Sequence, residues 1–234
     1  IMSIDYDAIK ATGALGGPHK IKVKTADNLA RELRRFSGGD RVPVICIPGL
    51  TRNRRDFDEF GEWVATLGRD VFAISLRGRG ASDPDPNYLN YHPLTYRDDM
   101  LHVIDSLGLD RAVFAGTSLG GIVTMLMNEA APGRVAAAII NDVGPELAPE
   151  GIARIASYVG VDRPDARSID EAAELIKAVN DVAFPGREMD FWRDFAHKTF
   201  REMSDGRWAL DYDQAIGKAM VEVGPAPDLW PAFA

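Results

Sequence analysis

The stretch Val113–Gly121, which reads VFAGTSLGG, decides the fold of this chain. The apolar residues Ala112–Ala115 are typical of a buried strand, and a helical pattern of apolar residues follows the stretch. A strand that turns into a helix over so few residues forces Ser118, between them, into a tight backbone conformation. Gly116 and Gly120 remove the side chains that would collide there. We therefore predict a sharp turn that raises the Ser118 hydroxyl above the edge of a sheet.

The rest of the first half of the chain alternates between strands and helices. Apolar runs predict buried strands at residues 41–47, 71–75, 112–115 and 135–141, and an edge strand is expected at 20–24. Helices are expected at 57–67, at 95–107 with Thr95 as its cap, and at 119–131; residues 28–36 suit either a strand or a short helix. Such alternation predicts a doubly wound, mostly parallel α/β sheet, in which ligands bind at the carboxyl ends of the strands.

The pattern changes after Asp142. Residues 144–225 contain helical stretches at 152–158, 168–183 and 190–203 and no convincing strand, and Ser168 with Glu171 forms a capping box. We expect a core at 1–143, a helical lid at 144–225 inserted after the strand that ends near Asn141, and a return toward the core at 226–234. Four aromatic residues either line an apolar pocket beneath this lid or, for most of them, hold its helices together: Phe191, Trp192, Phe195 and Trp208.

Composition narrows the class of protein. The chain has 234 residues, 46% of them hydrophobic, and a net charge of −8, which argues against a nucleic-acid-binding surface. No apolar run approaches the roughly 20 residues of a membrane span, and we do not expect Ile1–Lys10 to act as a secretory signal. The single cysteine, Cys46, lies in an apolar strand, where packing is its expected role. We expect a cytoplasmic protein with no nucleic-acid or membrane partner, no metal site and no cofactor.

Three segments, in order, resemble the α/β-hydrolase superfamily, specifically its lid-bearing esterase and lactonase-like branch. Residues 47–50 (IPGL) resemble the turn after the third strand, 77–83 (RGRGASD) the loop after the fourth, and 116–121 (GTSLGG) the nucleophile elbow after the fifth. Together they cover the core from about Val42 to Asp142. One departure is Pro48, where most relatives have a histidine that supports the loop and does not itself react.

The resemblance implies that Ser118 attacks a carbonyl carbon and becomes acylated. The backbone N–H groups of Leu50 and Leu119 would hold the resulting oxyanion. Leu50 belongs to the turn after the third strand, which also contains the motif glycine Gly49. Each donor of this kind can contribute on the order of 3 kcal/mol to the transition state. Because main-chain groups act here, the positions of these two leucines matter more than their side chains.

The same resemblance requires a base and an acid. None of the histidines follows a late core strand; they are His19, His92, His102 and His197. In the family the base follows the last strand, so we expect about 50 further residues of the same protein, outside this sequence, to supply two strands, the histidine and the acid. His197 is the alternative base. Asp142, at the end of a core strand, is either the catalytic acid or a cap of the turn that follows.

These inferences predict a serine hydrolase that cleaves an ester or lactone of a small, largely apolar acid. A serine nucleophile disfavours the dehalogenase and epoxide-hydrolase branches of the family, which use aspartate. Hydrolysis of C–C bonds and acyl transfer use the same serine and remain open. A ligand receptor built on this fold is the alternative outside the enzymes.

Overall fold

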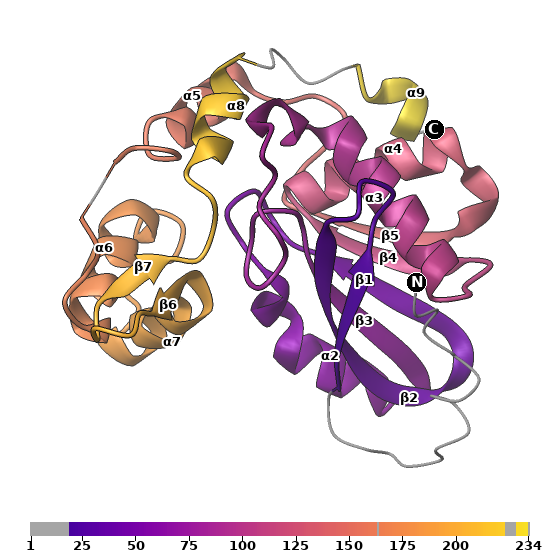
Figure 1. The fold of residues 1–234 in the computed structure, drawn as a ribbon, viewed down its shortest axis with the longest axis horizontal. Helices are drawn as coiled ribbons and strands as arrows, with labels where there is room; N and C mark the ends of the chain where they lie inside the picture. The colour runs from indigo at the N-terminus through magenta and orange to yellow at the C-terminus, as the bar shows by residue number, and fades with distance from the viewer. Residues whose placement is uncertain (1–18, 163, 223–227, 234) are drawn as a thin grey trace.

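The computed structural model describes residues 19–162, 164–222 and 228–233. A five-stranded sheet forms the centre of the molecule (Figure 1). Its strands are β1 (His19–Lys24), β2 (Ala30–Ile47), β3 (Arg69–Ser75), β4 (Ala112–Thr117) and β5 (Val135–Asn141). The order across the sheet is β1-β2-β4-β5, and β3 also pairs with β2.

The long strand β2 folds back around β3. Its first part, Glu32–Phe36, pairs antiparallel with β3. In its second part, Val44–Cys46 lie opposite residues 71–73 in the same chain direction, as in a parallel pair. A Cβ atom on Gly38, between the two parts, would lie 2.3 Å from the Arg69 carbonyl oxygen, so the turn needs glycine. Residues 28–36, which the sequence left open, are therefore mostly strand, and the second part continues in parallel register to β4 and β5.

Helices cover both faces of the sheet, as the doubly wound fold requires. Alternating residues of β2 face opposite ways: Ile45 and Ile47 pack with α3 (Pro93–Ser106) and α4 (Leu119–Ala130), and Val44 and Cys46 pack toward α2 (Asp58–Ala65). This alternation explains why the second part of β2, residues 42–47, is entirely apolar. Three short 3₁₀ turns complete this part: η1 (Arg54–Phe57), η2 (Tyr88–Asn90) and η3 (Pro132–Arg134).

The cap of α3 differs from the prediction. The helix begins at Pro93, and the Nδ1 atom of His92 accepts a hydrogen bond from the Leu94 N–H at 3.1 Å. Thr95 is the third residue of the helix, so its assignment as the cap was wrong. Proline suits the first helical position because its missing N–H would have no partner there, and this places the cap at the residue before it.

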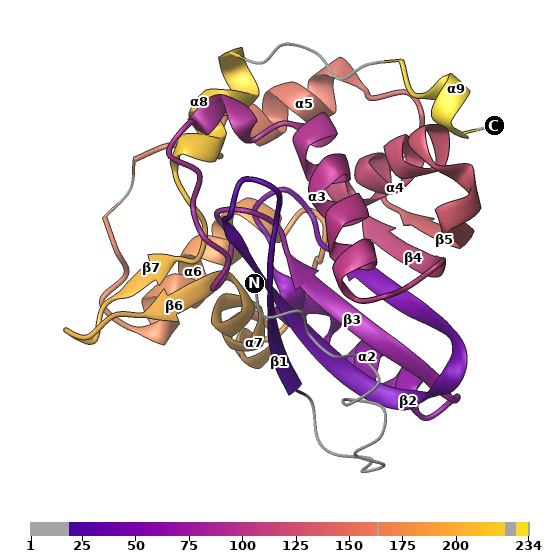
Figure 2. The same cartoon turned by 45° about the vertical axis from the view of Figure 1, so that its right-hand side comes forward.

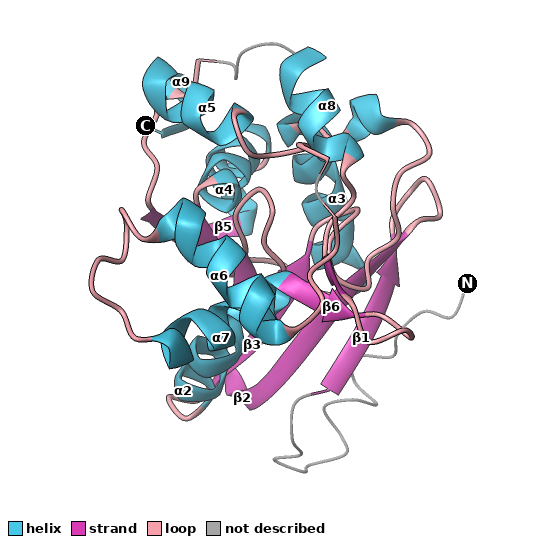
Figure 3. Ribbon diagram, turned by 90° about the vertical axis from the view of Figure 1, so that its left-hand side faces the viewer, coloured by secondary structure: helices cyan, strands magenta, loops and turns pink. Residues whose placement is uncertain are grey.

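The α5–α8 segment (residues 149–222) contains most of the remaining helices. Its elements are α5 (Pro149–Ala156), α6 (Ile169–Asn180), α7 (Met189–Thr199), β6 (Phe200–Glu202), β7 (Trp208–Leu210) and α8 (Ala215–Glu222). Ser168 Oγ accepts from the Glu171 N–H at 3.2 Å, which confirms the predicted cap of α6. The expectation of no strand here was wrong, because β6 and β7 form an antiparallel hairpin whose strands are too short for a period of two to show. Figure 3 shows α6 and α7 side by side, in front of the sheet.

Strand β5 is exposed, although its apolar sequence predicted a buried strand. Residues 136–139 are exposed, Ile139 to 52%, because among the described strands β5 pairs only with β4. Farther along the chain, α9 (Trp230–Phe233) returns to pack against α4, where Leu229 and Ala232 are buried (Figure 2). Residues 226, 227 and 234 lie outside the described part. None of the helices in that part is long and apolar enough to cross a membrane.

Candidate functional site

Ser118 lies at the sharp turn that the sequence predicts. It stands between β4 and α4 with φ 50° and ψ −113°, a conformation that costs an ordinary side chain free energy. Backbone hydrogen bonds hold it on both sides: its N–H donates to the Asn141 carbonyl at 2.8 Å, and its carbonyl accepts from the N–H groups of Gly121 at 2.9 Å and Ile122 at 3.2 Å. The turn is thus fixed both to β5 and to the first turn of α4.

The flanking glycines are required by contact with the backbone. A Cβ atom on Gly116 would lie 2.3 Å from the Gly120 carbonyl oxygen, and one on Gly120 would lie 2.0 Å from the Ile47 carbonyl oxygen. Real Cβ atoms do not come so close to another atom. The two glycines therefore let β4, α4 and the end of β2 approach closely enough to hold Ser118 at the surface of the sheet.

The turn after β2 lies next to Ser118. Its first residue, Gly49, accepts a hydrogen bond from the Arg52 N–H at 3.1 Å, so Leu50 and Thr51 form the tip of a tight turn. A Cβ atom on Gly49 would lie 3.8 Å from the Ser118 Cβ atom. On the other side, Leu119 is the first residue of α4, so its N–H has no acceptor within the helix. The N–H groups of Leu50 and Leu119 are the two that the sequence analysis predicts as oxyanion donors.

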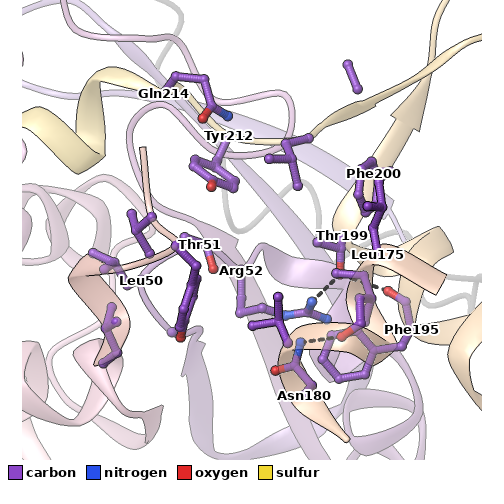
Figure 4. A pocket seen from close by; sticks show the side chains of 18 of the residues that line it. Leu50, Thr51, Arg52, Leu175, Asn180, Phe195, Thr199, Phe200, Tyr212 and Gln214 are labelled. Atoms are coloured by element: carbon purple, nitrogen blue, oxygen red, sulfur yellow. Dashed lines mark hydrogen bonds between the residues drawn. The ribbon is translucent and has the colours of Figure 1, made fainter. Parts of the chain in front are cut away.

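Ser118 lines a cavity of about 530 Å³. Figure 4 shows side chains of this cavity from close by. Its core side is formed by residues at or just after the carboxyl ends of β2, β4 and β5, namely Gly49, Leu50, Thr117, Ser118 and Asp142. Its other walls belong mainly to the α5–α8 segment and include Ile155, Tyr158, Leu175, Phe195 and Trp208. The serine thus faces a chamber with mostly apolar and aromatic walls.

Two of the four aromatic residues singled out in the sequence line this cavity, and two do not. Phe195 and Trp208 are part of its wall. Trp192 is fully buried between the helices of the α5–α8 segment, its Nε1–H donates to the Arg187 carbonyl at 3.2 Å, and Phe191 packs edge-on against it. Phe191 and Trp192 are therefore not pocket residues; they hold α6 and α7 together, the role that the sequence favoured for most of the four.

Asp142 also opens onto the cavity. It directly follows β5 and has a φ of 58°, a left-handed conformation that aspartate tolerates better than most residues. Within the described residues its carboxylate has no hydrogen-bond partner. The structure thus brings Asp142 to the same cavity as Ser118.

The four histidines lie elsewhere. His92 caps α3, His102 lies within that helix, and His19 begins β1. His197 is exposed on α7 and packs edge-on against Trp208 at 5.2 Å between ring centroids. None of them lines the cavity, so His197 is not placed to take a proton from Ser118.

Polar contacts that no sequence pattern indicates join the turn after β2 to the α5–α8 segment. The Arg52 guanidinium lies 4.2 Å from the centre of the Phe195 ring, donates to Thr199 Oγ1, and forms an ion pair with Asp56. These partners are up to 147 positions apart in the chain, so no local pattern could reveal them. They neutralise the charge of Arg52 within the cavity wall.

A second set of contacts starts from the next residues of the same turn. Asn53 donates to the Lys198 carbonyl at 2.9 Å, and Arg55 pairs with Asp211 at 2.5 Å. Burial raises the pKa of the Asp211 carboxyl, and the Arg55 guanidinium opposes that rise. The turn that carries Leu50 is thereby tied to the β6–β7 hairpin.

Cys46 has no chemical role in this site. The side chain is fully buried beneath α2, and burial raises the pKa of its thiol, which keeps it protonated. We expect no reaction of the native protein with Ellman's reagent near neutral pH, and one equivalent of released thiolate after unfolding in guanidinium chloride. Rapid reaction of the native protein would contradict this placement.

Elsewhere, the described residues contain no group of three or more His, Cys, Asp or Glu that could hold a metal ion.

Comparison with known proteins agrees with this geometry. The family model described as "alpha/beta hydrolase fold" matches residues 42–224. The crystal structure of an alpha/beta hydrolase from Novosphingobium aromaticivorans superposes with a TM-score of 0.85 and 37% sequence identity, covering 94% of this chain and 78% of that one.

Two curated relatives carry names that describe activities. The 3-hydroxybutyrate-oligomer hydrolase of Cupriavidus necator is 29% identical over 74% of this chain and 59% of its own length. Ethanol acetyltransferase 1 of Kluyveromyces marxianus is 31% identical over 46% of this chain and 29% of its own length. This chain thus spans less than two thirds of either relative.

Proposed function

Because the chain belongs to the alpha/beta hydrolase family, we propose that it is a serine hydrolase that cleaves a carboxylic ester or lactone through an acyl-enzyme on Ser118. One observation carries the proposal: Ser118 is held at positive φ between β4 and α4 and opens onto a cavity of about 530 Å³. The mostly apolar walls favour a small, largely apolar substrate. Lactones and open esters present the same carbonyl carbon to the serine.

The reaction proceeds in two halves. The Ser118 oxygen bonds to the carbonyl carbon as a base takes the hydroxyl proton, and the resulting oxyanion accepts hydrogen bonds from the N–H groups of Leu50 and Leu119. The C–O bond then breaks, and the alcohol leaves with the proton. Water, activated by the same base, hydrolyses the acyl-serine through a second oxyanion. Each of the two donors supplies on the order of 3 kcal/mol.

The base of this mechanism is not one of the histidines that the structure describes. All four histidines lie away from the cavity, whereas a serine needs a base within hydrogen-bond reach. We propose that a further segment of the same protein supplies a histidine and covers the exposed strand β5.

Residues 1–234 alone should then react with an organophosphonate far more slowly than the longer protein does. Equal rates of reaction would contradict the proposal.

The α5–α8 segment acts in this proposal as the lid of the site. It forms most of the cavity wall, and Asp211 and Arg52 attach it to the turn that carries Leu50.

A cytoplasmic location is also proposed, in keeping with the single, buried Cys46.

Asp142 is the proposed acid. We expect Asp142→Asn to lower kcat by about 100-fold or more, because an amide cannot stabilise an imidazolium in the way a carboxylate does. Asparagine also tolerates the left-handed backbone at this position, so Tm should stay near that of the wild-type protein. Steady-state hydrolysis and thermal unfolding measure the two effects. An unchanged kcat would move the acid role to another residue.

Acyl transfer to an alcohol is the second candidate, because one relative is named an ethanol acetyltransferase. The discriminating experiment incubates the whole protein with a p-nitrophenyl ester, with and without an added alcohol, and identifies the acyl product. A free acid in both samples supports the hydrolase, and a new ester supports the transferase. Binding without turnover would indicate a receptor, and turnover of a diketone but not of esters would indicate C–C bond hydrolysis.

A further inference from the structure

Arg79 is a buried arginine that differs from the other buried arginines of the described structure. Each of those faces a carboxylate, and the pairs are Arg31–Asp99, Arg35–Asp70, Arg54–Glu32 and Arg77–Asp99. Arg79 is fully buried and forms no ion pair with any residue that the structure describes. A buried charge without a counter-charge costs free energy, so its position calls for a reason other than stability.

The guanidinium instead contacts backbone carbonyls and tyrosines. Its Nε–H donates to the Leu50 carbonyl at 2.9 Å, and Nη1 donates to the Arg77 carbonyl at 2.6 Å and to the Tyr96 hydroxyl at 2.9 Å. The rings of Tyr91 and Tyr96 lie 5.6 and 4.9 Å from its central carbon. The remaining nitrogen, Nη2, is buried and has no hydrogen-bond partner among the described residues.

The contact with Leu50 completes the immobilisation of the turn beside Ser118. The peptide group between residues 49 and 50 contains the Leu50 N–H, and its carbonyl is held by the Arg52 N–H at 3.1 Å. The next peptide group, between residues 50 and 51, is held by Arg79 through the Leu50 carbonyl. Since both peptide planes around the Leu50 Cα are hydrogen-bonded, neither φ nor ψ of Leu50 can change without breaking one of these bonds. The direction of the Leu50 N–H is therefore fixed.

We propose that Arg79 is a positioning residue for the reaction on Ser118: it fixes the Leu50 N–H as an oxyanion donor and places an uncompensated positive charge behind that donor. The inference rests on the proposed function. An oxyanion hole accelerates a reaction because its donors are aimed before charge develops, and a donor that must first reorient loses much of that benefit. A buried charge is also screened only weakly by salt. Both effects act on the transition state more than on the bound substrate.

The test compares Arg79→Met, Arg79→Lys and the control Arg35→Met in the whole protein. Arg35 is also buried, but it pairs with Asp70 near the Gly38 turn and does not line the cavity. For a p-nitrophenyl ester we expect Arg79→Met to lower kcat by about 10- to 100-fold with KM changed by less than about threefold. Arg79→Lys, which keeps the charge but loses the planar fork, should recover part of kcat. Arg35→Met should lower Tm and leave kcat unchanged.

The outcomes separate this inference from the proposed function. If Ser118→Ala is inactive while folded Arg79→Met or Arg79→Lys retains the wild-type kcat, Arg79 has no positioning role and the serine hydrolase stands. If Arg79→Met does not fold, the lysine variant decides the question, and wild-type kcat in that variant overturns the inference. A loss of kcat in Arg35→Met equal to that in Arg79→Met would show that any lost buried arginine disturbs the site, which also contradicts it. Activity that survives in Ser118→Ala would instead refute the proposed function.

Discussion

Ser118→Ala is expected to lower kcat for ester hydrolysis by about 10⁴-fold or more, because no acyl-enzyme can form without the hydroxyl. The alanine side chain removes one oxygen atom from a residue that faces a cavity, so the fold should persist and Tm should change little. Steady-state kinetics on p-nitrophenyl esters and a thermal melt of the same preparation measure the two quantities. This is the largest effect on activity that the structure predicts.

The matched control is Ser204→Ala. Ser204 is exposed in the turn between β6 and β7, away from the cavity, so this variant should keep both kcat and Tm. Residual turnover above about 10% in a well-folded Ser118→Ala protein would assign the chemistry to another residue.

Gly120→Ala is expected to have the largest effect on stability. The added methyl group would lie 2.0 Å from the Ile47 carbonyl oxygen, and neither β2 nor α4 can move away without breaking the packing around Ser118. Overpacking of this kind costs about 3 kcal/mol or more when the obstacle is backbone and not a flexible side chain. We expect a fall in the denaturation midpoint of urea unfolding, or a loss of folded protein on expression.

Gly133→Ala provides the control for that experiment. A Cβ atom at Gly133 would meet nothing within 4 Å, so the free energy of unfolding should change by less than about 0.5 kcal/mol. Equal stability of the two variants would mean that the close approach of α4 to β2 is not a constraint on this fold.

The site could be predicted best from the sequence where a local motif contains glycines that the close approach of backbone segments requires. Gly116 and Gly120 are needed because backbone atoms occupy the space of a side chain, and that need is visible in the sequence itself. The alternation of apolar runs and helical patterns likewise predicted the central strands of an α/β sheet, because β3 and the second part of β2 are buried on both faces. The position of Ser118 follows from these two features.

The sequence could not predict features that depend on distant or missing neighbours. The apolar residues of β5 indicated burial, but burial depends on what pairs with the strand, and β5 pairs only with β4 among the described strands. The Arg52 contact with Thr199 and the Arg79 contact with Leu50 join residues far apart in the chain. The division of the aromatic residues, with Phe195 in the cavity wall and Trp192 in the packing of α6 and α7, depends on how the helices face each other.

The most direct test of the central claim is to find the residue that reacts. The whole protein would be incubated with a fluorophosphonate, and the intact mass and then the modified peptide would be measured by mass spectrometry. We expect a single adduct on Ser118 that forms at the rate at which ester hydrolysis is lost and is absent from Ser118→Ala. An adduct on another residue, or complete loss of ester hydrolysis with Ser118 unmodified, would contradict it.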